Sequence, residues 1–272
     1  MARRPLPEHA NLRHTRADLR EPAARRALAG VDVLFHLGFQ LWRRGSRPDE
    51  MADANLAGTR NAVAAGPGRV VFASSAAVCG AWPDNPLPIA ETHVPRPNRE
   101  CAYAAQKLEA ERICAEAAPT VVLRIGAVLG PGADPLVRRG IAGYRRVVPA
   151  VRGARQALQF VHEDDAVAAL RAAAVAGAAG EVVNVATDDW LDEGEIATLA
   201  GGRVVRLPRR VMLAVAEAAF RTRVFDAGAD RAVLLSGPLA LDCTRAHDVL
   251  GWRATRGSAD VLKGFLAGSV PS

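Results

Sequence analysis

Lysine, tyrosine and cysteine are scarce in this chain of 272 residues. Its 35 basic residues include only two lysines, Lys107 and Lys263, and it has two tyrosines. The four cysteines have neither C-x-x-C spacing nor a companion cluster of histidines. This pattern indicates reduced thiols, predicts no metal site, and is typical of a cytoplasmic protein.

Long hydrophobic runs are missing, and aromatic residues are few. No apolar run reaches the roughly 18 residues that a membrane span needs, and the opening MARRPLPEHANLRH has no apolar core of a secretory signal. Aromatics are 5% of the residues, and the net charge of +6 comes from scattered arginines. Nucleic-acid interfaces are basic stripes with interleaved aromatics. We therefore expect neither a nucleic-acid nor a membrane partner.

Apolar runs and helical patterns alternate along most of the chain. The runs typical of strands buried on both faces lie at 32–38, 69–75, 120–126 and 181–186. The helical patterns cover 49–65, 103–118 and 163–177. This alternation predicts an α/β fold with a parallel sheet and right-handed crossovers. We expect one domain over 1–186 and a smaller substrate-binding lobe over 187–272, where short helices and Pro-punctuated loops begin.

A tyrosine stands four positions before a lysine in CAYAAQK, residues 101–107. Positions i and i+4 share a helix face, so Tyr103 and Lys107 would project side by side. An ammonium there stabilises the phenolate and lowers the pKa of the tyrosine, which makes an acid/base group. The alternative is an ordinary surface pair. Ser74 and Ser75 follow a buried strand, where they could supply a catalytic hydroxyl or only cap a turn.

Further stretches share the order and spacing of one family. They are NLAGTRN (55–61), ADLREPAARRALAGVDVLFHLG (17–38), LRIGAVLGPG (123–132), FVHEDDAVAAL (160–170) and LDCTRAHDVLGW (241–252). Together with the Tyr-x-x-x-Lys and Ser-Ser motifs, they make the chain resemble the extended short-chain dehydrogenase/reductases. More narrowly, it is similar to the NAD-dependent epimerase/dehydratase family. The resemblance implies a Rossmann-like domain and a small-molecule substrate, and by analogy a homodimer.

The resemblance also implies roles for individual residues. Tyr103 would be the general acid/base, and Lys107 would tune its pKa and contact a cofactor ribose. Ser75 would be the catalytic hydroxyl, with Ser74 as the alternate. The residues implied to bind NAD(P) are Asp18, Leu19, His36, Leu37, Gly38, Lys107 and Arg4, the last of which would suit the 2′-phosphate of NADP.

Members of the family open with a strand and a G-x-x-G-x-x-G turn that binds the cofactor pyrophosphate. Here the first glycine is Gly30, and no such turn precedes it. The expected fold is therefore Rossmann-like but truncated at its N-terminus. Its sheet edge would stay open, be covered by a neighbouring subunit, or pair a strand at 11–18 with one at 31–37 through a crossover helix at 20–29.

Three functions remain open at this point. The first is an NAD(P)-dependent oxidoreductase or epimerase acting on a small hydroxyl- or carbonyl-bearing substrate. The second is a non-redox isomerase, dehydratase or cyclase that uses the same Tyr–Lys pair without a dinucleotide. The third is a non-catalytic scaffold or binding protein. Ala76 and Ala77 stand where 4,6-dehydratases of the family carry Asp-Glu, which argues against that reaction.

Overall fold

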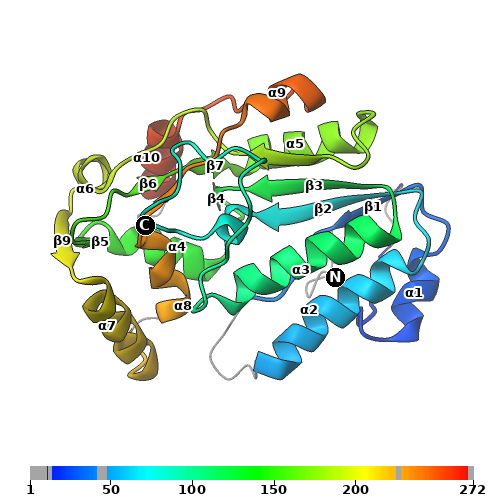
Figure 1. The fold of residues 1–272 in the computed structure, drawn as a ribbon, viewed down its shortest axis with the longest axis horizontal. Helices are drawn as coiled ribbons and strands as arrows, with labels where there is room; N and C mark the ends of the chain where they lie inside the picture. The colour runs from blue at the N-terminus through cyan, green and yellow to red at the C-terminus, as the bar shows by residue number, and fades with distance from the viewer. Residues whose placement is uncertain (1–10, 12–13, 42–47, 225–227, 269–272) are drawn as a thin grey trace.

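The main sheet consists of four parallel strands in the order β1-β2-β3-β8 (Figure 1). The structure is a computed structural model and describes residues 11, 14–41, 48–224 and 228–268. The strands of the main sheet are β1 (Val33–His36), β2 (Arg69–Ser75), β3 (Thr120–Ile125) and β8 (Val182–Val185). All four coincide with the apolar runs of the sequence, which confirms the predicted parallel sheet.

Helices cover both faces of this sheet, as the alternation of the sequence predicts. On one face, α2 (Pro48–Val63) and α3 (Ala102–Ala117) pack on side chains such as Val70 and Phe72. On the other, α5 (Glu163–Val175) and α9 (Thr244–Leu250) pack on side chains such as Val71. Consecutive side chains of β2 thus pack into apolar cores on opposite faces of the sheet, as the pleat of a strand requires. Figure 1 shows the two helical layers on either side of the sheet.

β1 lies at the edge of the described sheet. The crossover helix expected at 20–29 is present as α1 (Pro22–Leu28). Of the three alternatives for this edge, the strand at 11–18 is wrong in its described part, because residues 14–18 form no strand and, among the described residues, β1 pairs only with β2. The segment HTRAD is polar and offers a sheet few β-branched or aromatic side chains, so little apolar burial would reward pairing there.

The rest of the chain forms short paired strands and helices around a second core. The paired strands are β4 (Ala127–Leu129) with β7 (Phe160–His162), β5 (Val147–Val151) with β9 (Arg203–Leu207), and β6 (Ala157–Leu158) with β10 (Pro238–Leu239). The remaining helices are α4 (Pro135–Gly143), α6 (Glu193–Ala200), α7 (Arg209–Arg221), α8 (Ala229–Ala232) and α10 (Ser258–Gly268), with 3-10 turns η1 (Ala76–Cys79) and η2 (Val233–Leu235).

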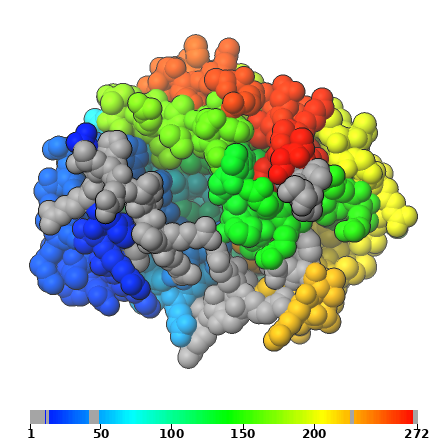
Figure 2. Space-filling view, turned by 180° about the vertical axis from the view of Figure 1, so that it is seen from behind, coloured from blue at the N-terminus to red at the C-terminus, as the bar shows by residue number. Residues whose placement is uncertain are grey.

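The helix α10 packs into this second core. Its Leu262 and Phe265 join Leu129, Ile141 and Ile196 in one apolar cluster. Figure 2 shows the surface of α10, in red, next to the green and yellow surfaces of these segments. Strands β5 and β9 pair across the proposed boundary between 186 and 187, so the division into two domains stays a prediction.

Candidate active site

Tyr103 and Lys107 lie one turn apart near the start of α3, as the sequence predicts. The segment AYAAQKLEAERICAEA is rich in strong helix formers, and the helix begins at Ala102. Tyr103 packs beside Ala77 of η1, the turn that directly follows β2. The start of α3 therefore meets the carboxyl end of β2, the edge at which open α/β sheets bind ligands.

The two serines at the end of β2 have different partners. The Ser74 hydroxyl is buried and donates a short hydrogen bond to Oε1 of Glu111 on α3. Ser75 accepts a hydrogen bond from the backbone N–H of Ala77 at 3.2 Å, and its side chain is near enough to Tyr103 to lower the pKa of the phenol in part. The structure therefore places Ser75 beside Tyr103, while Ser74 is engaged within the core.

Lys107 is buried, with 4% of its surface exposed. Its Nζ donates a hydrogen bond to the backbone carbonyl of Ala73 on β2. The same nitrogen lies 4.0 Å from the ring centroid of Phe39 and 5.9 Å from that of Tyr103. The ammonium is therefore close to the tyrosine ring, but its nearest neighbours are Ala73 and Phe39.

Burial dominates the acid/base properties of the pair. It raises the pKa of Tyr103 to about 12, although the nearby Ser75 side chain and the charge of Arg231 lower it in part. It also lowers the pKa of Lys107 to about 7. The lowered tyrosine pKa expected from sequence is thus wrong for this arrangement, since desolvation of a phenolate outweighs the nearby favourable groups. At neutral pH Tyr103 is a protonated hydroxyl and thus a proton donor.

Asp18 and Leu19 lie just before α1, which begins at Pro22. The Asp18 carboxylate accepts a hydrogen bond from Nη2 of Arg20 at 2.7 Å, and this partner lowers the pKa of Asp18. Leu19 is half-buried, and its backbone carbonyl accepts a hydrogen bond from Nδ2 of Asn61 at 2.9 Å. Asn61 therefore ties the Asp-Leu segment to α2.

The remaining proposed cofactor residues lie at the end of β1. His36 is buried, and its Nε2 lies 2.8 Å from the Thr59 hydroxyl, so its ring points into the core. Leu37 is 55% exposed and Gly38 is half-buried, so both residues are accessible at the end of β1. Arg4 lies outside the described residues.

Sequence reasoning missed a buried group beneath the site. Arg124 on β3 donates from Nη2 to Oε2 of Glu111 at 2.9 Å, and both side chains are nearly inaccessible. Together with Ser74, the pair joins α3 to the two central strands. The position of Glu111, one turn beyond Lys107 on the same helix face, was the signal that could have revealed it.

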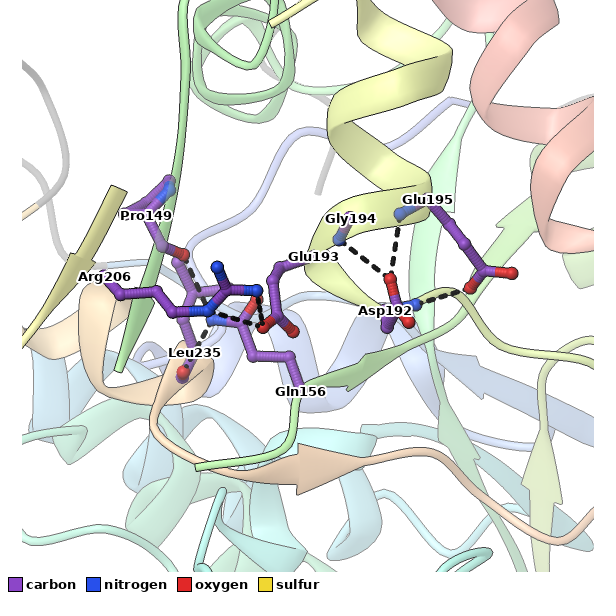
Figure 3. Close-up of polar contacts among 8 residues, drawn as sticks. All are labelled: Pro149, Gln156, Asp192, Glu193, Gly194, Glu195, Arg206 and Leu235. Carbon is purple, nitrogen blue, oxygen red and sulfur yellow. Dashed lines mark hydrogen bonds and ion pairs between the residues drawn. The ribbon is translucent and has the colours of Figure 1, made fainter. Parts of the chain in front are cut away.

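A polar cavity of about 700 Å³ lies elsewhere, around the start of α6. Figure 3 shows its polar contacts: Asp192 caps the helix by accepting from the N–H groups of Gly194 and Glu195, and Glu193 pairs with Arg206. The carboxylate of Asp192 thus caps the helix, and that of Glu193 pairs with an arginine. Within the described ranges, no helix is long and apolar enough to cross a bilayer, and no cluster of metal-ligating side chains occurs.

A parallel sheet with helices on both faces, and a ligand edge at its carboxyl ends, defines a Rossmann-type α/β protein. The chain belongs to the NAD dependent epimerase/dehydratase family, whose model matches residues 1–186. An uncharacterized protein of Mycobacterium tuberculosis is 26% identical over 267 residues, covering 93% of this chain and 70% of that protein. An uncharacterized protein of Sinorhizobium fredii is 27% identical, with 90% and 65% covered.

Solved structures of similar fold carry NAD or NADPH. MoeE5 in complex with UDP-glucuronic acid and NAD superposes with a TM-score of 0.74 at 24% identity, covering 97% of this chain and 88% of that one. RMD from Pseudomonas aeruginosa complexed with NADPH gives a TM-score of 0.66 at 22% identity, with 93% and 87% covered. At these identities, the likeness establishes the shared fold.

Proposed function

We propose that this chain is an NAD(P)-dependent oxidoreductase or epimerase-like enzyme acting on a small hydroxyl- or carbonyl-bearing substrate. The observation that carries the proposal is the meeting of Tyr103, Ser75 and Lys107 at the carboxyl edge of the sheet. Tyr103 donates a proton to the substrate oxygen, and Ser75 holds that oxygen by a hydrogen bond. Charge that develops on the oxygen is stabilised when the nearby Lys107 is protonated.

The described residues fit a dinucleotide in their chemistry. Leu37 exposes apolar surface at the end of β1, where a ring can pack, and Asp18 with Leu19 matches the family's adenine-contacting pair. Family membership and the NAD or NADPH of similar folds support the same assignment. When bound, the nicotinamide supplies hydride exchange at a substrate carbon. Tyr103 supplies or removes the accompanying proton.

A second candidate is non-redox acid/base chemistry at the same site. It rests on the Tyr103 hydroxyl alone, because a phenol is protonated at neutral pH and can donate a proton without any dinucleotide. Isomerisation, dehydration and cyclisation all need such a donor. Ala76 and Ala77 offer no further acid/base group beside Ser75, so Tyr103 would act as the donor alone.

Two measurements test the proposal. Titration of the purified protein with NADH and NADPH, followed by nucleotide fluorescence, should show saturable binding below about 1 mM for one of them. Absence of saturation in that range removes the redox function and leaves the second candidate. Tyr103→Phe should abolish turnover under either function, and an unaltered rate in a correctly folded variant removes both.

A further inference from the structure

Three aromatic rings surround the ammonium of Lys107. Its Nζ lies 4.0 Å from the ring centroid of Phe39, 4.8 Å from that of Phe72 and 5.9 Å from that of Tyr103. All three distances fall within the roughly 6 Å at which a cation is attracted to an aromatic face. In a chain with seven Phe and two Tyr, three such rings converge on one of two lysines.

The rings come from three elements and support one another. Phe39 follows β1, Phe72 lies in β2, and Tyr103 is in the first turn of α3. Phe39 meets Tyr103 edge-to-face with centroids 5.7 Å apart and meets Phe72 with centroids 6.4 Å apart. These are favourable aromatic geometries. Phe39 contacts both other rings and lies nearest to Nζ. It therefore completes the group of three aromatic rings around Lys107.

Asn55 on α2 fixes the loop that carries Phe39. Its Oδ1 accepts from the backbone N–H of Gln40 at 2.7 Å, and its Nδ2 donates to the Gln40 carbonyl at 3.1 Å. Nδ2 also donates to Oε1 of Gln106 at 2.7 Å, directly before Lys107. A single buried amide thus joins the Phe39 loop to the helix that presents the lysine.

The charged and titratable groups around Lys107 provide only part of what a buried cation needs. Glu111, on its own helix, favours the charged lysine, but its carboxylate also pairs with Arg124. Burial raises the pKa of the neighbouring Cys114 thiol to about 12, so this group is neutral at neutral pH. From β1, burial and the Lys107 charge lower the pKa of His36 to about 4, so its ring adds no second cation at neutral pH. Among the described residues, desolvation therefore acts on the ammonium without a dedicated counter-ion, and the aromatic faces supply attraction in its place.

We propose that Phe39, together with Phe72 and Tyr103, forms an aromatic cage that favours the protonated form of Lys107 within the core and fixes its ammonium one helical turn from Tyr103. Phe39 is then a positioning residue: it acts on the site through Lys107. The proposal rests on the proposed role of Lys107 beside Tyr103. Its test needs no substrate, because the cage is detected on the lysine itself.

The experiment uses the scarcity of lysine. The full chain, labelled with ¹³C at lysine Cε, gives signals from Lys107 and Lys263 only, and Lys263→Arg assigns them. In the wild type, ring currents should displace the Lys107 signal from that of exposed Lys263. Phe39→Leu keeps an apolar side chain but removes the ring. The titration midpoint of Lys107 should then fall by roughly 0.5 to 1 pH unit, the equivalent of one cation–π contact.

Two further variants make the test specific. Phe39→Tyr retains a ring and should preserve both the displaced signal and the midpoint. Phe35→Leu changes an exposed phenylalanine of β1 and should also leave both unaltered. An unchanged Lys107 midpoint in folded Phe39→Leu overturns the cage. If that variant does not fold, the wild type alone decides, since a Lys107 signal coincident with that of Lys263 overturns the cage as well.

The outcomes separate this proposal from the proposed function. A lowered Lys107 midpoint in Phe39→Leu, with turnover unaffected by Tyr103→Phe, supports the cage and removes the enzymatic role. An unchanged midpoint, with turnover abolished by Tyr103→Phe, removes the cage and keeps the enzymatic role.

Discussion

Glu111 and Arg124 form a buried ion pair, with Nη2 of Arg124 2.9 Å from Oε2 of Glu111 and exposures of 7% and 6% for the two side chains. The pair joins α3, which carries Tyr103 and Lys107, to β3 in the centre of the sheet. Ser74 of β2 adds its hydroxyl to the same carboxylate. One carboxylate therefore links the site helix to both β2 and β3.

Replacing that carboxylate should destabilise the protein strongly. Glu111→Gln leaves the Arg124 guanidinium buried without a counter-charge, and we expect the free energy of unfolding to fall by about 3 to 5 kcal/mol. Urea denaturation followed by circular dichroism measures it. Glu109→Gln is the matched control, since Glu109 forms an exposed pair with Arg112 on the same helix and should change stability by less than about 1 kcal/mol. Equal losses in the two variants would contradict this account.

Substitutions of the two serines of β2 should affect different properties, turnover in one case and stability in the other. Ser75→Ala removes the hydroxyl beside Tyr103, so we expect turnover to fall on the order of 100-fold with little loss of stability. Ser74→Ala removes a hydrogen bond to a buried charged group and should lower the free energy of unfolding by roughly 1.5 to 3 kcal/mol. Steady-state rates and urea denaturation of both variants test the assignment. The reverse pattern would make Ser74 the catalytic hydroxyl.

His36 should make stability depend on mild acid. Its pKa is lowered by burial from 6.5 to about 4, so between these values the unfolded chain binds a proton that the folded chain does not. The His36 contribution is therefore complete above pH 6.5 and is lost as the pH falls towards 4, by on the order of 3 kcal/mol. Thermal unfolding of the wild type and His36→Gln over this range measures the difference. His247→Gln, which changes an exposed histidine, should follow the wild-type curve.

The loop after β1 should open more often when the side-chain amide of Asn55, which binds its backbone, is removed. Asn55→Ala leaves both backbone groups of Gln40 without their side-chain partner, so exchange of the Gln40 amide hydrogen should accelerate. Hydrogen exchange followed by NMR measures that rate. Asn61→Ala, on the same helix, removes only the bond to Leu19 and should leave Gln40 protected. Unaltered protection of Gln40 in Asn55→Ala would show that other contacts hold the loop.

The sheet was predictable because its strands are buried on both faces. The run 69–75 coincides with β2, since a nearly continuous apolar stretch leaves a parallel strand as the simplest solution. The shared face of Tyr103 and Lys107 followed from helical spacing alone. The possible strand that included residues 14–18 was wrong, because it was inferred from the strand order of the family, whereas these residues lack strand character.

The direction of the Lys107 ammonium could not be predicted. It depends on Phe39 and Ala73, which only the folded chain brings next to the helix. The choice between Ser74 and Ser75 likewise depends on the register of β2 against α3, although strand alternation required that one of them point away. Burial of Tyr103, and with it the direction of its pKa change, is a property of packing that spacing does not contain.

The packing of α10 also constrains the order in which the chain can fold during synthesis. Strands β1, β2 and β3 neighbour one another in the order in which the ribosome produces them. The second core is different, because Leu262 and Phe265 near the end of the chain complete a cluster begun at Leu129. Leu129 and its neighbours therefore lack part of their apolar packing until the segment that carries Leu262 and Phe265 has been synthesised.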